Sequence, residues 1–256
     1  MTVPAIAWML LTFTCLLLVM RGVTYSLQKT GWQQSDVRRI SRFTAGWLLT
    51  WVILLLVLAK QGFFADMSLL PPRPALAILL PLPVVLWFSF SRKGTQLITS
   101  IPPQWIIWLQ SFRIAVELLL LLAFIKGKLP VQMTFEGLNF DILSGLLAVP
   151  TGFLLARKRR FATRIAIVYN LAGLLLLLNI LVIAVLSMLT PLRYFMNEPS
   201  NTIVGEFPYI LLPGMLVPLA YSLHIFSLRQ LVLSNRTCPG AFPGNQQKAV
   251  GTDWTG

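Results

Sequence analysis

Seven long apolar segments, separated by short polar stretches, dominate this sequence. By residue number they are 4–22, 44–61, 74–91, 104–125, 140–157, 163–187 and 207–228. A helix needs about 20 mostly apolar residues to cross about 30 Å of hydrocarbon, and each segment is close to that length. The third is the weakest because Pro81 and Pro83 interrupt it. The pattern predicts an all-α, polytopic integral membrane protein in which residues 1–232 form a seven-transmembrane-helix bundle.

The composition also indicates a lipid environment. Hydrophobic residues make up 56% of the chain and charged residues 11%, whereas about 25% of the residues in a soluble domain are charged. The net charge of +13 does not predict binding to nucleic acid, because the basic residues lie in short loops between the apolar segments. Residues 233–256 turn polar and are rich in Pro and Gly, which predicts a disordered cytoplasmic tail.

The loop charges predict an orientation. Fifteen of the 21 Lys and Arg residues fall on one side of the predicted spans and five on the other. Basic residues stay cytoplasmic, so we expect the N-terminus outside and the C-terminus inside. The basic run Arg157, Lys158, Arg159 and Arg160 is expected to contact anionic lipid head groups at the inner face. The segment 32–43 is either a short interfacial helix or an inward extension of the second span.

The fourth apolar segment carries the strongest functional signal. Gln110, Arg113 and Glu117 are spaced i, i+3 and i+7, so they share one helix face. Arg113 and Glu117 are four residues apart and are expected to pair directly. Charged residues inside a membrane helix are functional candidates by default, although a permanent structural ion pair gives the same pattern. Both interpretations stay open.

Asn139 and Asp141 stand at the predicted outer start of the fifth helix. One interpretation makes Asn139 the helix cap and Asp141 an acid of the first turn, favoured by the helix dipole. The other makes them an outer mouth in which Asp141 faces Glu117.

His224 is the single histidine and lies in the inner third of the last predicted span. Asn170, in the antiparallel sixth span, falls at a similar depth. By the same depth argument, His224 should lie far from Asp141. Pro213 and Pro218 predict a break in the last helix, since each proline removes a helical N–H donor.

Several classes of site are excluded by what the sequence lacks. One histidine is too few for a bis-histidine haem or an HExxH zinc site, and there is no GxxxxGK[ST], GxGxxG or CxxC motif. We therefore expect no cofactor and no metal, and we assign no catalytic residue.

The stretches FPYILLPGMLVPLAYSLHIFSLRQL, FEGLNFDILSGLLAVP and LQSFRIAVELLLLL resemble uncharacterised small bacterial multi-pass membrane proteins, some of them described as permeases. The resemblance covers about residues 100–232. It implies a bacterial inner (plasma) membrane and brings with it no assigned activity and no functional residues.

Three hypotheses about function follow from the residues. The first is a small permease or ion-coupled carrier that uses Glu117, Arg113 and Asp141. The second is a non-catalytic subunit or sensor module that binds a protein partner, a second copy of itself or anionic lipid through the basic inner face. The third is an intramembrane enzyme that uses His224 with Asp141 or Glu117.

Overall fold

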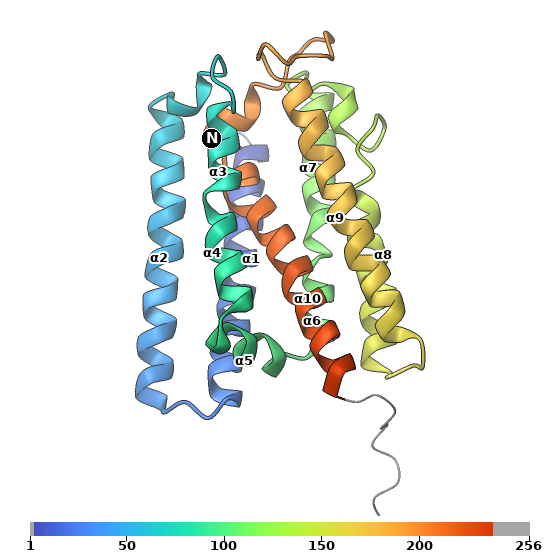
Figure 1. Cartoon of the computed structure of the whole chain (residues 1–256). Coiled ribbons are helices and arrows are strands. Elements are labelled where there is room, and N and C mark those ends of the chain that lie inside the picture. The colour runs from blue at the N-terminus through green and yellow to red at the C-terminus, as the bar shows by residue number, and fades with distance from the viewer. Residues whose placement is uncertain (1–2, 238–256) are drawn as a thin grey trace, which may run out of the picture.

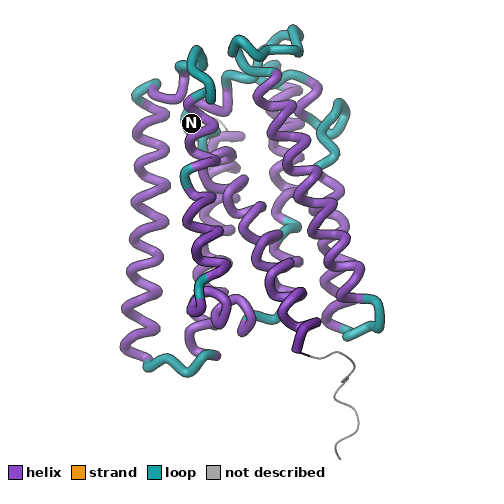
Figure 2. The backbone as a smooth tube through the Cα atoms, in the orientation of Figure 1, coloured by secondary structure: helices purple, strands orange, loops and turns teal. Residues whose placement is uncertain are grey.

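The computed structural model describes residues 3–237 of the chain, and over these residues it contains helices and loops with no strand (Figures 1 and 2). The α-helices are α1 (Val3–Lys29), α2 (Gln34–Lys60), α3 (Arg73–Leu79), α4 (Pro81–Phe90), α5 (Arg92–Ser100), α6 (Pro103–Leu109), α7 (Phe112–Ile125), α8 (Ile142–Ala156), α9 (Ala162–Leu186) and α10 (Val217–Thr237). Short 3₁₀ turns are η1 (Phe63–Ala65), η2 (Val131–Met133) and η3 (Ile203–Gly205), and η4 (Leu212–Leu216) is a π-helical turn. The all-α prediction is confirmed for the described residues.

The helices form an up-and-down bundle in which successive long segments are joined at alternating ends (Figure 1). Six of these segments within residues 3–237 are long and apolar enough to cross a membrane, and α8 is a shorter apolar helix that packs against α6, α7 and α9. Helices of this length and composition indicate a membrane protein. The connections α1–α2 and α8–α9, together with α5 and the end of α10, lie at the lower end of the bundle in Figure 1. The basic loops of the sequence therefore gather at one end.

Three of the long segments are interrupted. The third consists of α3 and α4, which meet at Leu80, next to Pro81. The fourth is split into α6 and α7 at Gln110 and Ser111. The last begins as the π-helical turn η4 before continuing as α10, in the region where Pro213 and Pro218 predict a break. Missing N–H donors account for the first and third interruptions.

The structure decides between the two interpretations of segment 32–43. Helix α2 runs without a break from Gln34 to Lys60, so most of this segment extends the second apolar helix and no separate interfacial helix forms. A short helix that the sequence analysis does not predict, α5, packs instead against the lower ends of α1 and α10. Gln230 on α10 holds it there by donating from Nε2 to the carbonyl oxygens of Ile98 and Ile101, at 3.0 and 2.6 Å.

The loop between α7 and α8 folds into the bundle rather than over it. Its residues Leu129, Met133 and Asn139 are at most 2% exposed. Helix α8 has only 15 residues, which rise about 22 Å. Because α8 is shorter than the long segments beside it and begins below the upper end of the bundle, the residues just before it lie inside the bundle. At the other terminus, α10 continues as a helix to Thr237, beyond residue 233 where the composition turns polar, and residues 238–256 lie outside the described part of the chain.

A buried polar cluster between α7, α8, α9 and α10

Seven polar residues singled out from the sequence are buried in the bundle. Each is 5% exposed or less, and they come from the α6–α7 junction, from α7, from the residues before α8, from α9 and from α10. They are Gln110, Arg113, Glu117, Asn139, Asp141, Asn170 and His224. Six of them form one chain of hydrogen bonds, and Gln110 donates from Nε2 to the carbonyl oxygen of Ala220 on α10, at 3.1 Å.

Arg113 is the centre of this chain. Its Nε donates to Oδ2 of Asp141 at 2.8 Å, and its Nη2 donates to Oδ1 of the same carboxylate. This is a bidentate ion pair, the geometry in which a guanidinium binds a carboxylate most strongly. The prediction that Arg113 pairs directly with Glu117 is wrong, because in the described part of the chain Arg113 makes its ion pair with Asp141 alone.

On the other side of Arg113, His224 continues the series of hydrogen bonds. Its Nε2 lies 2.9 Å from Nη1 of Arg113. A guanidinium can only donate, so Nε2 must accept, and the ring is neutral with its proton on Nδ1. Nδ1 then donates to Oδ1 of Asn170 at 2.9 Å, and Nδ2 of Asn170 donates to Oγ of Ser227 at 2.9 Å. Both ring nitrogens of His224 are thus engaged in hydrogen bonds.

The predicted separation of His224 from Asp141 is also wrong, because both side chains contact Arg113. The depth argument places Asp141 at the outer end of a full-length span. The α7–α8 loop instead carries Asp141 into the bundle, and the long side chain of Arg113 spans the remaining gap. The equal depth expected for His224 and Asn170 agrees with their direct contact.

Asn139 connects the ion pair to Glu117. Its Nδ2 donates to both carboxyl oxygens of Glu117, at 2.8 and 2.7 Å, and its Oδ1 accepts from the backbone N–H of Asp141 at 3.0 Å. Asn139 therefore supports the backbone just before α8 and brings Asp141 and Glu117 into one cluster. The prediction that Asn139 caps this helix is wrong, because the N-cap of α8 is Asp141 and no side chain caps the helix. Among the described residues, Asn139 is the one hydrogen-bond partner of Glu117.

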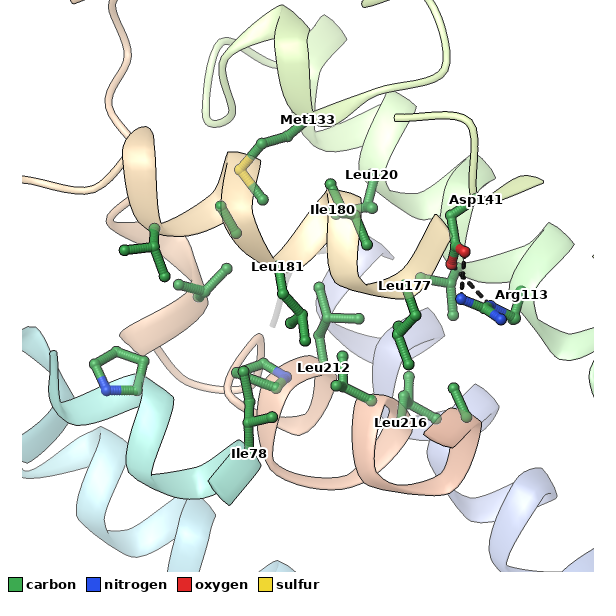
Figure 3. Close-up of a pocket in the computed structure, with 18 of the residues that line it drawn as sticks. Ile78, Arg113, Leu120, Met133, Asp141, Leu177, Ile180, Leu181, Leu212 and Leu216 are labelled. Atoms are coloured by element: carbon green, nitrogen blue, oxygen red, sulfur yellow. Dashed lines mark hydrogen bonds and ion pairs between the residues drawn. The ribbon is translucent and has the colours of Figure 1, made fainter. Parts of the chain in front are cut away.

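A cavity of about 210 Å³ lies against one side of the cluster. Arg113, Glu117 and Asp141 are its charged lining residues, and the remaining walls are apolar side chains from α3, α7, α9, η4 and α10. Figure 3 shows the Arg113–Asp141 pair at one side of this space, with Leu177, Leu181 and Leu216 bordering it. The cavity thus borders the charged residues of the cluster and is otherwise apolar.

A second, larger cavity of about 780 Å³ lies between α1, α2, α5, α6 and α10. Phe112, the first residue of α7, lines both cavities and is 9% exposed. Phe112 therefore borders both spaces.

Residues 73–232 match the family model of a domain of unknown function, DUF8737. The chain belongs to the DUF8737 family. The matched region begins at α3, contains the whole polar cluster and leaves out α1 and α2. No curated protein and no solved structure matches the chain.

Further cluster residues of the DUF8737 region are missed by the sequence analysis. Ser144 contacts Asp141, and Ser227 contacts Asn170. Each serine lies three residues after a cluster residue on the same helix or at its start, Ser144 after Asp141 and Ser227 after His224, which is the spacing that could have found them. Gly173 on α9 is the third, because a Cβ there would run into the ring of His224.

The basic run Arg157, Lys158, Arg159 and Arg160 lies far from the cluster. These residues are exposed in the connection between α8 and α9, at the lower end of the bundle. Within the described residues, no group of three or more His, Cys, Asp or Glu side chains is arranged to hold a metal ion.

Proposed function

We propose that this member of the DUF8737 family is a small permease or ion-coupled carrier of a bacterial inner membrane. In this proposal the seven apolar segments all cross the membrane, with α8 as the short crossing, and the N-terminus faces outward. The alternating connections and the gathering of basic loops at one end support this topology, since basic loops stay cytoplasmic.

The buried position of Glu117 is the observation that carries the proposal. It is 1% exposed, is hydrogen-bonded by the Asn139 amide and lines the 210 Å³ cavity. A buried carboxylate is costly unless it takes up a proton or meets a cation. The cation on its own helix, Arg113, is engaged by Asp141. Glu117 is therefore the acid available to exchange a proton or to bind a cationic substrate.

The interrupted helices support the same function. The α3–α4 junction, the α6–α7 junction and η4 all belong to segments that line the cavity. Irregular backbone at membrane depth is tolerated where it borders a protein cavity, and transporters use such broken helices to build their substrate sites. Phe112 lies at one of these junctions and borders both cavities, so its movement would join them.

The test is a proton flux measurement in proteoliposomes with a pH-sensitive dye trapped inside. A panel of amines, carboxylates, alcohols and amino acids is added outside to wild type, Glu117→Gln and the matched control Glu206→Gln, which alters an exposed glutamate. We expect a compound-dependent pH signal in the wild type and the control that Glu117→Gln lacks. A signal that Glu117→Gln retains at full size would overturn the role of Glu117.

The topology has its own test. In a background with Cys15 and Cys238 replaced by serine, Lys126→Cys should react with an impermeant maleimide added to intact cells. Lys158→Cys should react only after the membrane is opened. The reverse pattern would invert the proposed orientation.

A second candidate function rests on the basic end of the bundle. The exposed Arg157–Arg160 run lies at the same end as α5 and the start of α2, and a polybasic surface attracts anionic lipid or an acidic partner. This favours a subunit or sensor module. Neutralising the four residues should abolish co-purification with such a partner, whereas Glu117→Gln should not. A partner that stays bound after neutralisation would remove this candidate.

A further inference from the structure

The charges of the polar cluster do not balance. Arg113 contributes one positive charge, Glu117 and Asp141 contribute one negative charge each when both are ionised, and the hydrogen bonds of His224 require a neutral ring. Asp141 is neutralised by its bidentate pair with Arg113. Glu117 has an amide partner and borders the cavity, so its carboxylate has no cation of its own within the cluster.

The walls of the cavity restrict the chemistry of that cation. They are built almost wholly from Leu, Ile, Val, Ala, Pro and Met, and Phe112 is the one aromatic residue among the described residues that line it. A quaternary ammonium is recognised by a cage of several aromatic rings and cannot donate a hydrogen bond. A primary ammonium carries three N–H donors, which suit the unfilled acceptor positions of a carboxylate.

The volume of the cavity restricts the length of the ligand. An apolar cavity of about 150 Å³ holds benzene, so the 210 Å³ here accepts an aliphatic chain of roughly six to eight carbons. Arg113 and Asp141 lie at one side of the cavity (Figure 3), and Asn139 joins Glu117 to them, so such a chain would lie in the apolar body with its polar end toward the cluster.

We propose that this cavity binds a primary aliphatic amine in its protonated form, with the ammonium on the Glu117 carboxylate and the hydrocarbon chain between α3, α9 and η4. The inference names the substrate class of the carrier site and rests on the proposed function for its transport role. Binding itself requires only the cavity and the carboxylate.

The experiment measures binding of hexylamine to the whole protein in lipid nanodiscs by isothermal titration, with hexan-1-ol, hexanoate and hexyltrimethylammonium as comparators of equal chain length. We expect hexylamine to bind at least about tenfold more tightly than each comparator, the discrimination of one charge-assisted hydrogen bond. Equal binding of hexan-1-ol would overturn the inference, because Glu117 would then be neutralised by its own proton.

Two variants separate the site from partitioning into the bilayer. Glu117→Gln should lose the preference for hexylamine by about tenfold or more, whereas Glu206→Gln should keep it. Ala184→Phe, which fills the cavity from α9, should weaken hexylamine binding while leaving partitioning unchanged. A preference that survives Glu117→Gln would assign the binding to the lipid or to another site and overturn the inference.

Comparison with the proteoliposome experiment separates the two proposals. Hexylamine binding with no compound-dependent flux would support this inference and overturn the carrier. Flux driven by another class of compound, with no hexylamine binding, would overturn this inference and leave the carrier intact.

Discussion

The first two helices differ in burial from the fourth long segment, which consists of α6 and α7, and from the last, which ends in α10. Over its most apolar 18-residue stretch, α1 is 17% buried and α2 is 11% buried. The corresponding shares are 50% for Pro103–Ile125 and 56% for Leu212–Ser234. The first pair thus packs against the rest of the protein over little of its surface, whereas α6, α7 and α10 are about half enclosed by other helices. Both of the enclosed segments lie within the DUF8737 match, which begins after α2.

The difference shows where polar chemistry is possible in such a chain. A charged side chain that faces lipid costs several kcal/mol, so such groups occur where neighbouring helices enclose them. The apolar stretches of α1 and α2 have few enclosed positions, and their charged residues lie toward the helix ends. Arg113 and Glu117 lie on a helix packed by α1 and α8 and can be held by partners from other segments.

The largest expected effect tests whether the enclosed region depends on its ion pair. Asp141→Asn leaves Arg113 buried without a carboxylate, which should lower the free energy of unfolding by about 3–5 kcal/mol. The matched change at the periphery, Asp36→Asn on α2, should stay within about 0.5 kcal/mol of wild type. Denaturant unfolding in detergent measures both. Equal losses of unfolding free energy in the two variants would show that the two regions do not differ in this respect.

Two more variants identify the partner of Arg113. Adding Arg113→Gln to Asp141→Asn should restore much of the lost stability, since no charge is then stranded. Glu117→Gln should cost less than about 1 kcal/mol or even stabilise, because the carboxylate it removes has no ion-pair partner of its own. A loss at Glu117 as large as that at Asp141 would return the structural role to Glu117.

The second effect compares two helical glycines. Gly173→Ala would push a methyl group into the ring of His224, and such overpacking costs about 1–3 kcal/mol. Gly46→Ala on α2 meets no atom within 4 Å, so it should stabilise by about 0.5–1 kcal/mol through helix propensity. Shifts of opposite sign in the midpoint of thermal unfolding would confirm that the two regions differ in packing. A loss at both positions would show that α2 packs against a surface absent from the isolated chain.

The third effect concerns the link between the two regions. Trp51 on α2 donates from Nε1 to the carbonyl oxygen of Gly214 in the π-helical turn, at 2.9 Å. Trp51→Phe keeps an aromatic ring and removes the N–H donor, and the lost hydrogen bond should cost about 0.5–1.5 kcal/mol. Trp47→Phe, at an exposed position on the same helix, is the control and should change little. If both variants behave alike in denaturant unfolding, the hydrogen bond does not attach α2 to the core.

The sequence predicts the fold better than it predicts the contacts of the site. Apolar segment lengths locate the four middle segments to within a few residues, because spanning length and hydrophobicity are local properties. The first, second and last helices extend seven to ten residues beyond one predicted end, because their polar terminal turns stay helical. The helix face shared by Arg113 and Glu117 is also local, and both side chains do point inward. Their partners are not local: Asp141 reaches Arg113 only because the α7–α8 loop turns into the bundle, and no periodicity in the sequence reports that turn.

The smallest expected effect is a pH-dependent change in the stability of two loops at the upper end of the bundle, outside the apolar helices. One loop follows α2 and the other follows α9. Hydrogen bonds from Ser68, with Arg73 nearby, hold the pKa of Asp66 below its ordinary value, and a hydrogen bond from Arg193 does the same for the pKa of Glu198. Both groups are exposed, so the effect on stability is small. A lowered folded-state pKa means that each loop is stabilised above the unfolded carboxyl pKa of about 4. That stabilisation is lost as the pH falls through the folded-state pKa.

Hydrogen exchange of wild type and of Asp66→Asn with Glu198→Gln, each compared at matched pH, measures this small effect. At pH 7 the double variant should exchange faster than wild type in residues 63–72 and 193–200, because only the wild type has charged carboxylates there. At a pH below the folded-state values the two proteins should exchange alike, since the wild-type acids are then protonated. If faster exchange also spreads along α2 but not along α9, the sparsely buried pair α1 and α2 is the less firmly held region. A difference that persists at full size in acid would show that these loops are held by contacts other than the two carboxylates.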